Sequence, residues 1–224
     1  MNNFWEKMKK EKIPSSLEFD ESFLDLISPN SRILDLGCGN GDLCKKLSAK
    51  TFNVYGIDCS TEAIGNAKMR DLKSHYSVMD ASKLSFESDY FDFIIVKAVF
   101  TVIADAPTRS KIMSEIYRVL KNDGLLYIAD FAQTWWNSSY YKRYIENYPL
   151  TGECGLFKVL NQQGGVEYLA KHFAPKEIVD LYSDFDIETI IFDTIKVQTR
   201  SGNVIDGYKI LLRKALKENA VYEL

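Results

Sequence analysis

A glycine-rich segment carries the clearest chemical signal in this chain of 224 residues. Glycines stand at every second position of Gly37-Cys38-Gly39-Asn40-Gly41, directly after a short apolar run. Glycine lets a ligand lie against bare backbone and permits dihedral angles that other residues avoid. Asp58 stands at the end of the next apolar run, where a carboxylate can bind two ribose hydroxyls. The pattern predicts a site for an adenosine ligand.

Two further aspartates indicate which kind of adenosine ligand this is. A dinucleotide site has glycine or alanine as its third fingerprint residue, so that the pyrophosphate reaches the helix N-terminus. Asp42 stands there instead, and a carboxylate at that end of a helix repels phosphate. With Asp35 just upstream, the pocket is predicted to favour a cation without phosphate. An NAD-dependent oxidoreductase is therefore the less favoured class.

An aromatic cluster is the second candidate for chemistry. It follows the fifth predicted strand in a connection of about 40 residues, and connections of such length are often lids or binding loops. We predict that Trp135, Trp136, Tyr140 and Tyr144 line a pocket for a small organic ligand. Tyrosines at helical spacing also suit a helix packed on the core, which is the alternative. His172 is a candidate general base, with packing or capping as its alternative.

Alternating strands and helices must position these residues. Apolar runs predict strands at 33–36, 53–57, 75–79, 91–96 and 125–131. Helices are expected from the glycines to about residue 49, from Ser60 to about Arg70, and from the turn at Pro107 to a stop at 121–124. Later elements are a helix from Pro175, a strand over 185–198, a turn at 201–203 and a last strand through Leu212. This order predicts a doubly wound α/β sheet with helices on both faces and one antiparallel strand at or near its edge.

Composition narrows the class of protein. The chain is 46% hydrophobic and 26% charged, which is typical of a globular protein and excludes disordered and collagen-like classes. The net charge of -3 makes nucleic acid a less favoured partner. The four cysteines form no C-x-x-C pair, so neither a zinc site nor a redox dithiol is indicated. No secretory signal and no apolar run of about 20 residues is present, so we expect a cytoplasmic protein without a membrane span.

Five segments in order resemble the class I S-adenosylmethionine-dependent methyltransferases over roughly residues 31–131. These segments are Ile33-Leu34-Asp35-Leu36-Gly37-Cys38-Gly39-Asn40-Gly41, Tyr55-Gly56-Ile57-Asp58, Met79-Asp80-Ala81, Phe91-Asp92-Phe93-Ile94-Ile95-Val96 and Leu120-Lys121-Asn122-Asp123-Gly124-Leu125-Leu126. The resemblance implies a Rossmann-like sheet of seven strands, mostly parallel, with an antiparallel C-terminal strand and an aromatic-rich cap insertion. It also implies S-adenosyl-L-methionine as the cofactor, with S-adenosyl-L-homocysteine as the product.

The resemblance assigns cofactor contacts to particular positions. Asp35 would hold the ammonium group, Asp58 the ribose hydroxyls and Asp80 the adenine amino group. Lys97 would line the floor near the methionine tail, with its backbone carbonyl a more favoured contact than its amine. The full set of expected cofactor residues is Asp35, Gly37, Cys38, Gly39, Asp58, Cys59, Asp80, Ala81, Lys97 and Ala98.

We expect one methyltransferase domain in four parts. They are an N-terminal helical cap at 1–30, which includes Phe4, Trp5 and Met8, a cofactor-binding core at 31–131, an acceptor cap at 132–174, and a C-terminal helix and hairpin at 175–224. The predicted reaction moves a methyl group by in-line displacement to an O, N or S atom of a small molecule. Lys97-Ala98-Val99-Phe100 stands where enzymes that methylate the amino groups of adenine or glutamine carry Asn/Asp-Pro-Pro-Tyr/Phe. A non-catalytic cofactor-binding module and a methyltransferase acting on a protein or a tRNA stay open, as do a monomer and a homodimer.

Overall fold

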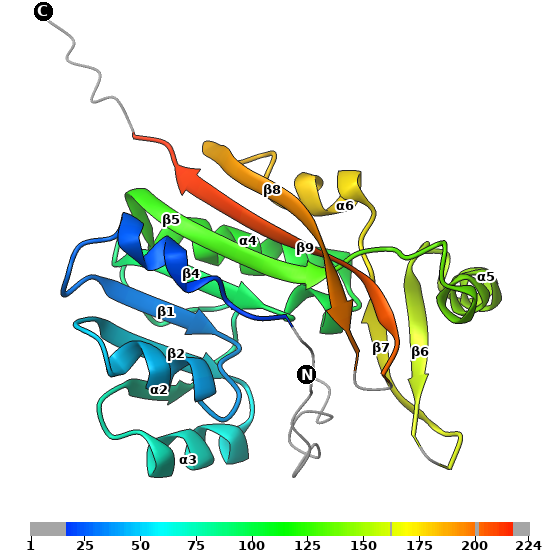
Figure 1. The fold of residues 1–224 in the computed structure, drawn as a ribbon, viewed down its shortest axis with the longest axis horizontal. Coiled ribbons are helices and arrows are strands. Elements are labelled where there is room, and N and C mark those ends of the chain that lie inside the picture. Colours follow the sequence, from blue (N-terminus) through cyan, green and yellow to red (C-terminus); the bar gives the residue numbers. More distant parts are fainter. Residues whose placement is uncertain (1–16, 162, 200–201, 217–224) are drawn as a thin grey trace, which may run out of the picture.

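A sheet of seven strands, in the order β3-β2-β1-β4-β5-β9-β8, forms the centre of the molecule (Figure 1). The computed structural model describes residues 17–161, 163–199 and 202–216. The strands are β1 (Arg32–Leu36), β2 (Asn53–Asp58), β3 (His75–Val78), β4 (Phe91–Lys97), β5 (Leu120–Phe131), β8 (Ile187–Gln198) and β9 (Val204–Lys214). β1 to β5 pair in parallel, whereas β9 is antiparallel to both β5 and β8. The predicted mostly parallel sheet with an antiparallel C-terminal strand is confirmed.

Helices cover both faces of this sheet. They are η1 (Glu21–Leu26), α2 (Asp42–Ser48), α3 (Thr61–Arg70), η2 (Phe100–Val102), α4 (Ala106–Val119), α5 (Ser138–Thr151) and α6 (Pro175–Asp180). One apolar core joins the sheet to η1, α2 and α3, and a second joins it to α4 and α6. Ser60 accepts a hydrogen bond from the Ala63 amide, and Asp105 accepts one from the Thr108 amide, so both helix starts are capped. The strand order reverses between β1 and β4, the place where ligands bind in open α/β sheets.

Two local predictions differ from the structure. In the described part of the helical cap expected at 1–30, only the short 3-10 helix η1 forms, and Leu17 and Phe19 reach the core from a segment outside any helix. The helix expected to stop at 121–124 ends at Val119, and that segment is the entry of β5. The expected helix with Phe4, Trp5 and Met8 lies outside the described residues, and so does part of the turn at 201–203.

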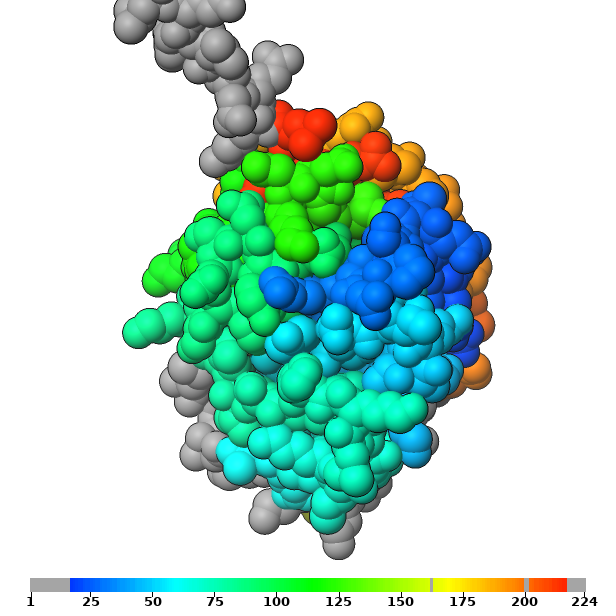
Figure 2. All heavy atoms as spheres, turned by 90° about the vertical axis from the view of Figure 1, so that its left-hand side faces the viewer, coloured from blue at the N-terminus to red at the C-terminus, as the bar shows by residue number. Residues whose placement is uncertain are grey.

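The cap contains a hairpin that the sequence did not reveal. Strands β6 (Leu156–Leu160) and β7 (Val166–Lys171) form a separate antiparallel sheet, and α5 packs beside β6 (Figure 1). The hairpin lies beyond the arrowheads of β1 and β4, at the carboxyl ends of the parallel strands. Figure 2 views the opposite end, where the first half of the chain, in blue to green, forms most of the surface. The cap therefore covers the end at which the predicted site lies.

Candidate active site

The loop between β1 and α2 adopts the backbone that its glycines predict. Gly37, Gly39 and Gly41 have φ of 78°, 53° and 75°, in the left-handed region that disfavours other residues. A Cβ at position 37 would lie 2.6 Å from Cγ2 of Val99, so this glycine is needed for packing. A Cβ at position 39 would meet nothing within 4 Å. The loop therefore leaves open space above Gly39, which suits a ligand lying against the backbone.

Asp58 connects this loop to the end of β2. Its Oδ2 accepts a hydrogen bond from the Gly39 amide at 3.0 Å, and its Oδ1 accepts one from the Ser60 amide at 2.9 Å. Each carboxylate oxygen has a second lone pair, so both can still accept a ligand hydroxyl. The side chain is half-buried beside the open space at Gly39. This geometry fits the predicted ribose contact.

Asp35 is a buried carboxyl that a cation would stabilise. It is 3% exposed, and its Oδ2 accepts from the Cys44 thiol at 3.4 Å. Burial raises the pKa of Asp35 to about 6, although the charge of Lys97 opposes the shift. A thiol is a weak donor, so this carboxylate is poorly compensated inside the protein. The donor set fits a ligand that carries an ammonium group.

The expected adenine contacts lie on two loops. Asp80 follows β3, and its Oδ1 accepts from both the amide and the hydroxyl of Ser82. Ala81 is half-buried and Cys59 is exposed. The Met79 amide donates to the Asp58 carbonyl at 3.0 Å, which brings the loop after β3 beside the end of β2. The contacts of these residues with adenine stay predictions.

The environment of Asp42 weakens one argument made from the sequence. Asp42 is the first residue of α2, and its Oδ1 lies 2.5 Å from Nη2 of Arg70. This pairing offsets part of the negative charge that was expected to repel phosphate. The buried Asp35 carboxyl is therefore the stronger indication of a cationic ligand.

The backbone at the end of β4 is unusual. Ala98 has φ of 55°, a conformation that is uncommon for alanine, and its amide donates to the Ala129 carbonyl at 2.8 Å. Strained backbone of this kind clusters at ligand sites. Lys97, the last residue of β4, lies beside it and is half-buried. Both positions belong to the predicted floor of the cofactor site.

His172 lies in the middle of the aromatic cluster rather than at an open surface. Its ring stacks on Phe131 and Tyr140, with centroids 5.4 and 5.1 Å away. Nδ1 of His172 lies 2.7 Å from the Tyr144 hydroxyl, which itself accepts from the Thr134 amide. The Tyr144 hydroxyl and Nδ1 of His172 thus share a hydrogen bond inside the cluster. Burial lowers the pKa of His172 to about 3, so the imidazole is neutral.

This placement bears on three predicted roles. Tyr140 and Tyr144 are buried against His172 and Phe157, and they pack the cap instead of presenting a free face. A histidine whose protonated form is this unfavourable makes a weak general base. The structure thus favours a packing role for His172, Tyr140 and Tyr144 over the predicted catalytic and acceptor contacts.

The two tryptophans are the exposed part of the cluster. Trp135 is 43% exposed and donates to Oε1 of Gln133 at 3.1 Å. Trp136 is 57% exposed, and its ring lies under the Lys196 ammonium at 4.3 Å. Their predicted contact with an acceptor stays a prediction.

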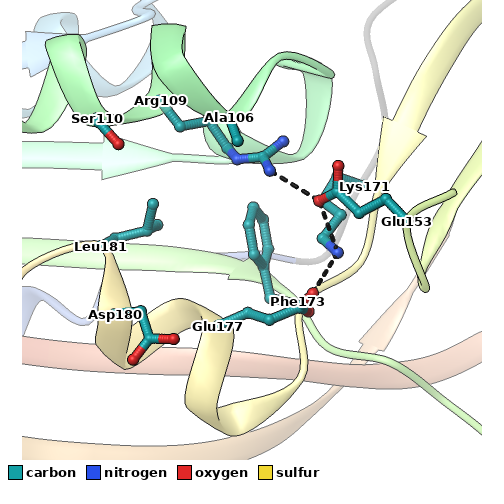
Figure 3. Close-up of a pocket in the computed structure, with 9 residues that line it drawn as sticks. All are labelled: Ala106, Arg109, Ser110, Glu153, Lys171, Phe173, Glu177, Asp180 and Leu181. Atoms are coloured by element: carbon teal, nitrogen blue, oxygen red, sulfur yellow. Dashed lines mark hydrogen bonds and ion pairs between the residues drawn. The ribbon is translucent and has the colours of Figure 1, made fainter. Parts of the chain in front are cut away.

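A charge network with two buried cations joins the cap to the core, and it was not predicted from the sequence (Figure 3). Lys171, at 1% exposed, lies 3.0 Å from the Glu153 carboxylate and 2.7 Å from that of Glu177. Arg109 on α4, at 5% exposed, lies 2.8 Å from Glu153. The Lys171 carbonyl accepts from the Thr101 hydroxyl at 2.8 Å, which connects β7 to the segment after β4.

These charges border a cavity of about 220 Å³ between α4, α6 and the cap residues Glu153 and Lys171. Figure 3 shows the Arg109, Lys171, Glu153 and Glu177 side chains pointing toward one another across it. Because each charge already has a partner of opposite sign, the cavity has the chemistry of a structural junction. Lys171 and Glu177 are 6 positions apart and Arg109 and Glu153 are 44 apart, so no pair stands at the spacing of neighbours on one helix.

The fold and the glycine loop together define a Rossmann-like methyltransferase architecture, and comparisons with known proteins agree. A family described as "Methyltransferase domain" matches residues 34–128. A solved structure of an S-adenosylmethionine-dependent methyltransferase from Methanosarcina mazei is 35% identical, with a TM-score of 0.86, over 90% of this chain and 100% of that one. The chain belongs to the class I S-adenosylmethionine-dependent methyltransferases, whose cofactor is S-adenosyl-L-methionine.

Curated relatives match over a smaller part. A ubiquinone biosynthesis O-methyltransferase of Bartonella tribocorum is 31% identical over 53% of this chain and 49% of that protein. A ubiquinone/menaquinone biosynthesis C-methyltransferase of Geotalea daltonii is 32% identical over 47% of each chain. The matches span about half the length of these relatives. In residues 17–161, 163–199 and 202–216, no helix combines the length and the apolar character needed to cross a membrane.

Proposed function

We propose that this chain transfers a methyl group from S-adenosyl-L-methionine to an O, N or S atom of a small organic acceptor. The observation that carries the proposal is the open space over Gly39, bordered by the Asp58 carboxylate and close to the buried Asp35 carboxyl. Hydroxyl-binding and cation-binding groups thus lie at one end of one sheet. An adenosine with a positively charged amino-acid tail has both matching groups.

The side chains of the chain bind and orient rather than react. The bound cofactor supplies an electrophilic methyl group, so no covalent protein intermediate is needed. Asp58 would hold the ribose, Asp35 the ammonium, and the left-handed turn at Ala98 would set the floor near the methyl. Orientation and exclusion of water can contribute about 7–11 kcal/mol in favourable cases. The cap over the carboxyl ends of the strands would exclude that water.

The acceptor is proposed from the cap and from the relatives together. Exposed Trp135 and Trp136 offer flat apolar surface, which suits an aromatic molecule. The two curated relatives are named for ubiquinone biosynthesis, one as an O-methyltransferase and one as a C-methyltransferase. A small aromatic alcohol is therefore the first acceptor to test. The match to the methyltransferase family ends at residue 128, before the cap begins. The family match therefore says nothing about which acceptor atom is methylated.

Calorimetry and labelled transfer test the proposal in two steps. The protein is expected to bind S-adenosyl-L-homocysteine and not NAD; binding of NAD alone would contradict the proposed cofactor site. With labelled S-adenosyl-L-methionine, label is then expected in the small-molecule fraction of a metabolite extract. Binding of S-adenosyl-L-homocysteine without any transfer of the labelled methyl group would indicate a non-catalytic module. Label in a protein or tRNA fraction would indicate a macromolecular acceptor.

A further inference from the structure

Lys97 and Asp35 occupy neighbouring positions on one face of the sheet. β1 and β4 pair in parallel, with Asp35 opposite Ile95. Side chains two residues apart on a strand point to the same face, so Lys97 points to the face that Asp35 and Ile95 share. The same face of the sheet packs against α2, the helix that follows the glycine loop. The two opposite charges therefore flank the carboxyl end of β1, where the glycine loop begins.

The two charges are close enough to interact but do not form an ion pair. Lys97 is the cation that most strongly opposes the raised pKa of Asp35. Yet their N and O atoms are not within the 4.0 Å of an ion pair. Within residues 17–161, 163–199 and 202–216, the Lys97 ammonium has no ion-pair or hydrogen-bond partner. The Lys97 ammonium is therefore free to bind a negatively charged group of a ligand.

The amino-acid tail of the cofactor has the complementary pair of charges, an ammonium and a carboxylate. An unpaired Lys97 would repel the sulfonium, since like charges in a partly buried site disfavour each other. A carboxylate placed against Lys97 removes that repulsion. We propose that the Lys97 ammonium binds the carboxylate of the cofactor's amino-acid tail, while Asp35 binds the ammonium group of the same tail. This inference rests on the proposed function. This assigns the contact to the amine of Lys97, in addition to the backbone carbonyl expected from the sequence.

Two ligands that differ only in the tail isolate this contact. Calorimetry compares S-adenosyl-L-homocysteine with 5′-methylthioadenosine, which lacks the amino-acid tail, on the full chain and on Lys97→Gln. We expect the Kd of the homocysteine ligand to rise by about tenfold to a hundredfold, as for a lost charge-assisted hydrogen bond. The Kd of 5′-methylthioadenosine is expected to change less than about twofold on the same scale. Retained binding of that ligand also shows that the variant is folded.

Two further variants complete the experiment. Lys97→Arg keeps the positive charge and is expected to retain most of the affinity for the homocysteine ligand. Lys45→Gln removes an exposed lysine from α2 and is expected to change neither Kd. Equal weakening of both ligands by Lys97→Gln, or no weakening of either, would overturn the inference. Failure of the unaltered chain to bind S-adenosyl-L-homocysteine would instead overturn the proposed function.

Discussion

The glycine loop and the cap are stabilised in different ways. In the loop, Gly39 and Asp58 are bonded across 19 positions of sequence, and glycine dihedral angles set the shape. Between the cap and the core, Thr101 bonds to Lys171 across 70 positions and Arg109 to Glu153 across 44. A loop built from short-range contacts can leave a surface open for a ligand. The contacts that hold the cap to the core instead pair its polar groups within the protein.

The balance of charge shows the same contrast. The Asp35 carboxyl has only a weak thiol donor, and Lys97 has no partner in the described part of the chain, so the loop presents unmatched charges. In the cap, Lys171 has two carboxylates as partners. Unmatched charge marks the region that awaits a ligand, and matched charge marks the region that fixes geometry. Four experiments test this contrast.

Removing the central charge of the cap is expected to have the largest effect. Lys171→Met takes away a buried partner of Glu153 and Glu177. Breaking a fully buried pair costs about 3–5 kcal/mol, and because both carboxylates are partly exposed we expect a loss of about 2–3 kcal/mol. Urea denaturation measures the free energy of unfolding. As a control, Lys142→Met breaks an exposed pair with Glu146 and is expected to cost less than about 1 kcal/mol. An equal loss in the two variants would show that the cap network is not special.

The two regions are expected to respond to pH with opposite sign. The pKa of His172 in the folded cap is about 3 and its ordinary value is 6.5, so between these values only the unfolded chain holds the proton. Stability from this group is therefore lost as the pH falls below about 6.5, by up to about 1.4 kcal/mol per pH unit. The pKa of Asp35 is raised from 3.8 to about 6, so its contribution is lost as the pH rises through that window.

Unfolding free energies measured from pH 4 to 6 separate these two contributions. His172→Gln keeps a hydrogen-bond acceptor for Tyr144 and is expected to lose less stability in acid than the unaltered chain does. Asp35→Asn is expected to change the slope in the other direction. If both variants shift the slope the same way, the assignment of a neutral His172 is wrong.

Ribose binding is expected to depend on Asp58 to an intermediate degree. Asp58→Ala removes a charged acceptor, and we expect binding of S-adenosyl-L-homocysteine to weaken by about 1–3 kcal/mol. Because Asp58 also accepts from the Gly39 and Ser60 amides, Asp58→Asn is the matched variant that keeps one acceptor oxygen. Calorimetry gives both affinities. An unchanged affinity in the alanine variant would remove Asp58 from the site.

The smallest effect on cofactor affinity is expected from the exposed face of the cap. Trp135→Ala should raise the KM of the acceptor, while the Kd of S-adenosyl-L-homocysteine changes by less than about twofold. The ring is 43% exposed and lies on the cap rather than on the glycine loop, so its loss leaves the loop intact. Steady-state kinetics and calorimetry on the same variant make the comparison. A weakened cofactor with an unaltered KM would show that the acceptor pocket is elsewhere.

Prediction from sequence worked best where structure is local. Ser60 capped its helix as expected because a cap involves residues three apart, and α5 formed where tyrosines recur at helical spacing. The hairpin β6–β7 was not predicted, although Asn161, Gly164 and Gly165 at its turn are residues typical of turns. The burial of His172, the candidate general base, could not be predicted, because the titration range of a histidine says nothing about its burial. Its neighbours Phe131 and Tyr140 come from distant positions.

The amino-acid sequence by itself determined the order of strands and helices, the glycine backbone of the loop and the aspartates at the ends of β1, β2 and β3. Hydrophobic periodicity, glycine dihedral angles and helix capping depend on residues close in the chain, so they can be predicted before the fold is known. Tertiary structure alone decided which charges are matched. It left Lys97 without a partner beside Asp35, surrounded Lys171 with carboxylates and enclosed His172 among rings. Burial and long-range pairing set these outcomes, because desolvation and Coulomb energies depend on distances in space.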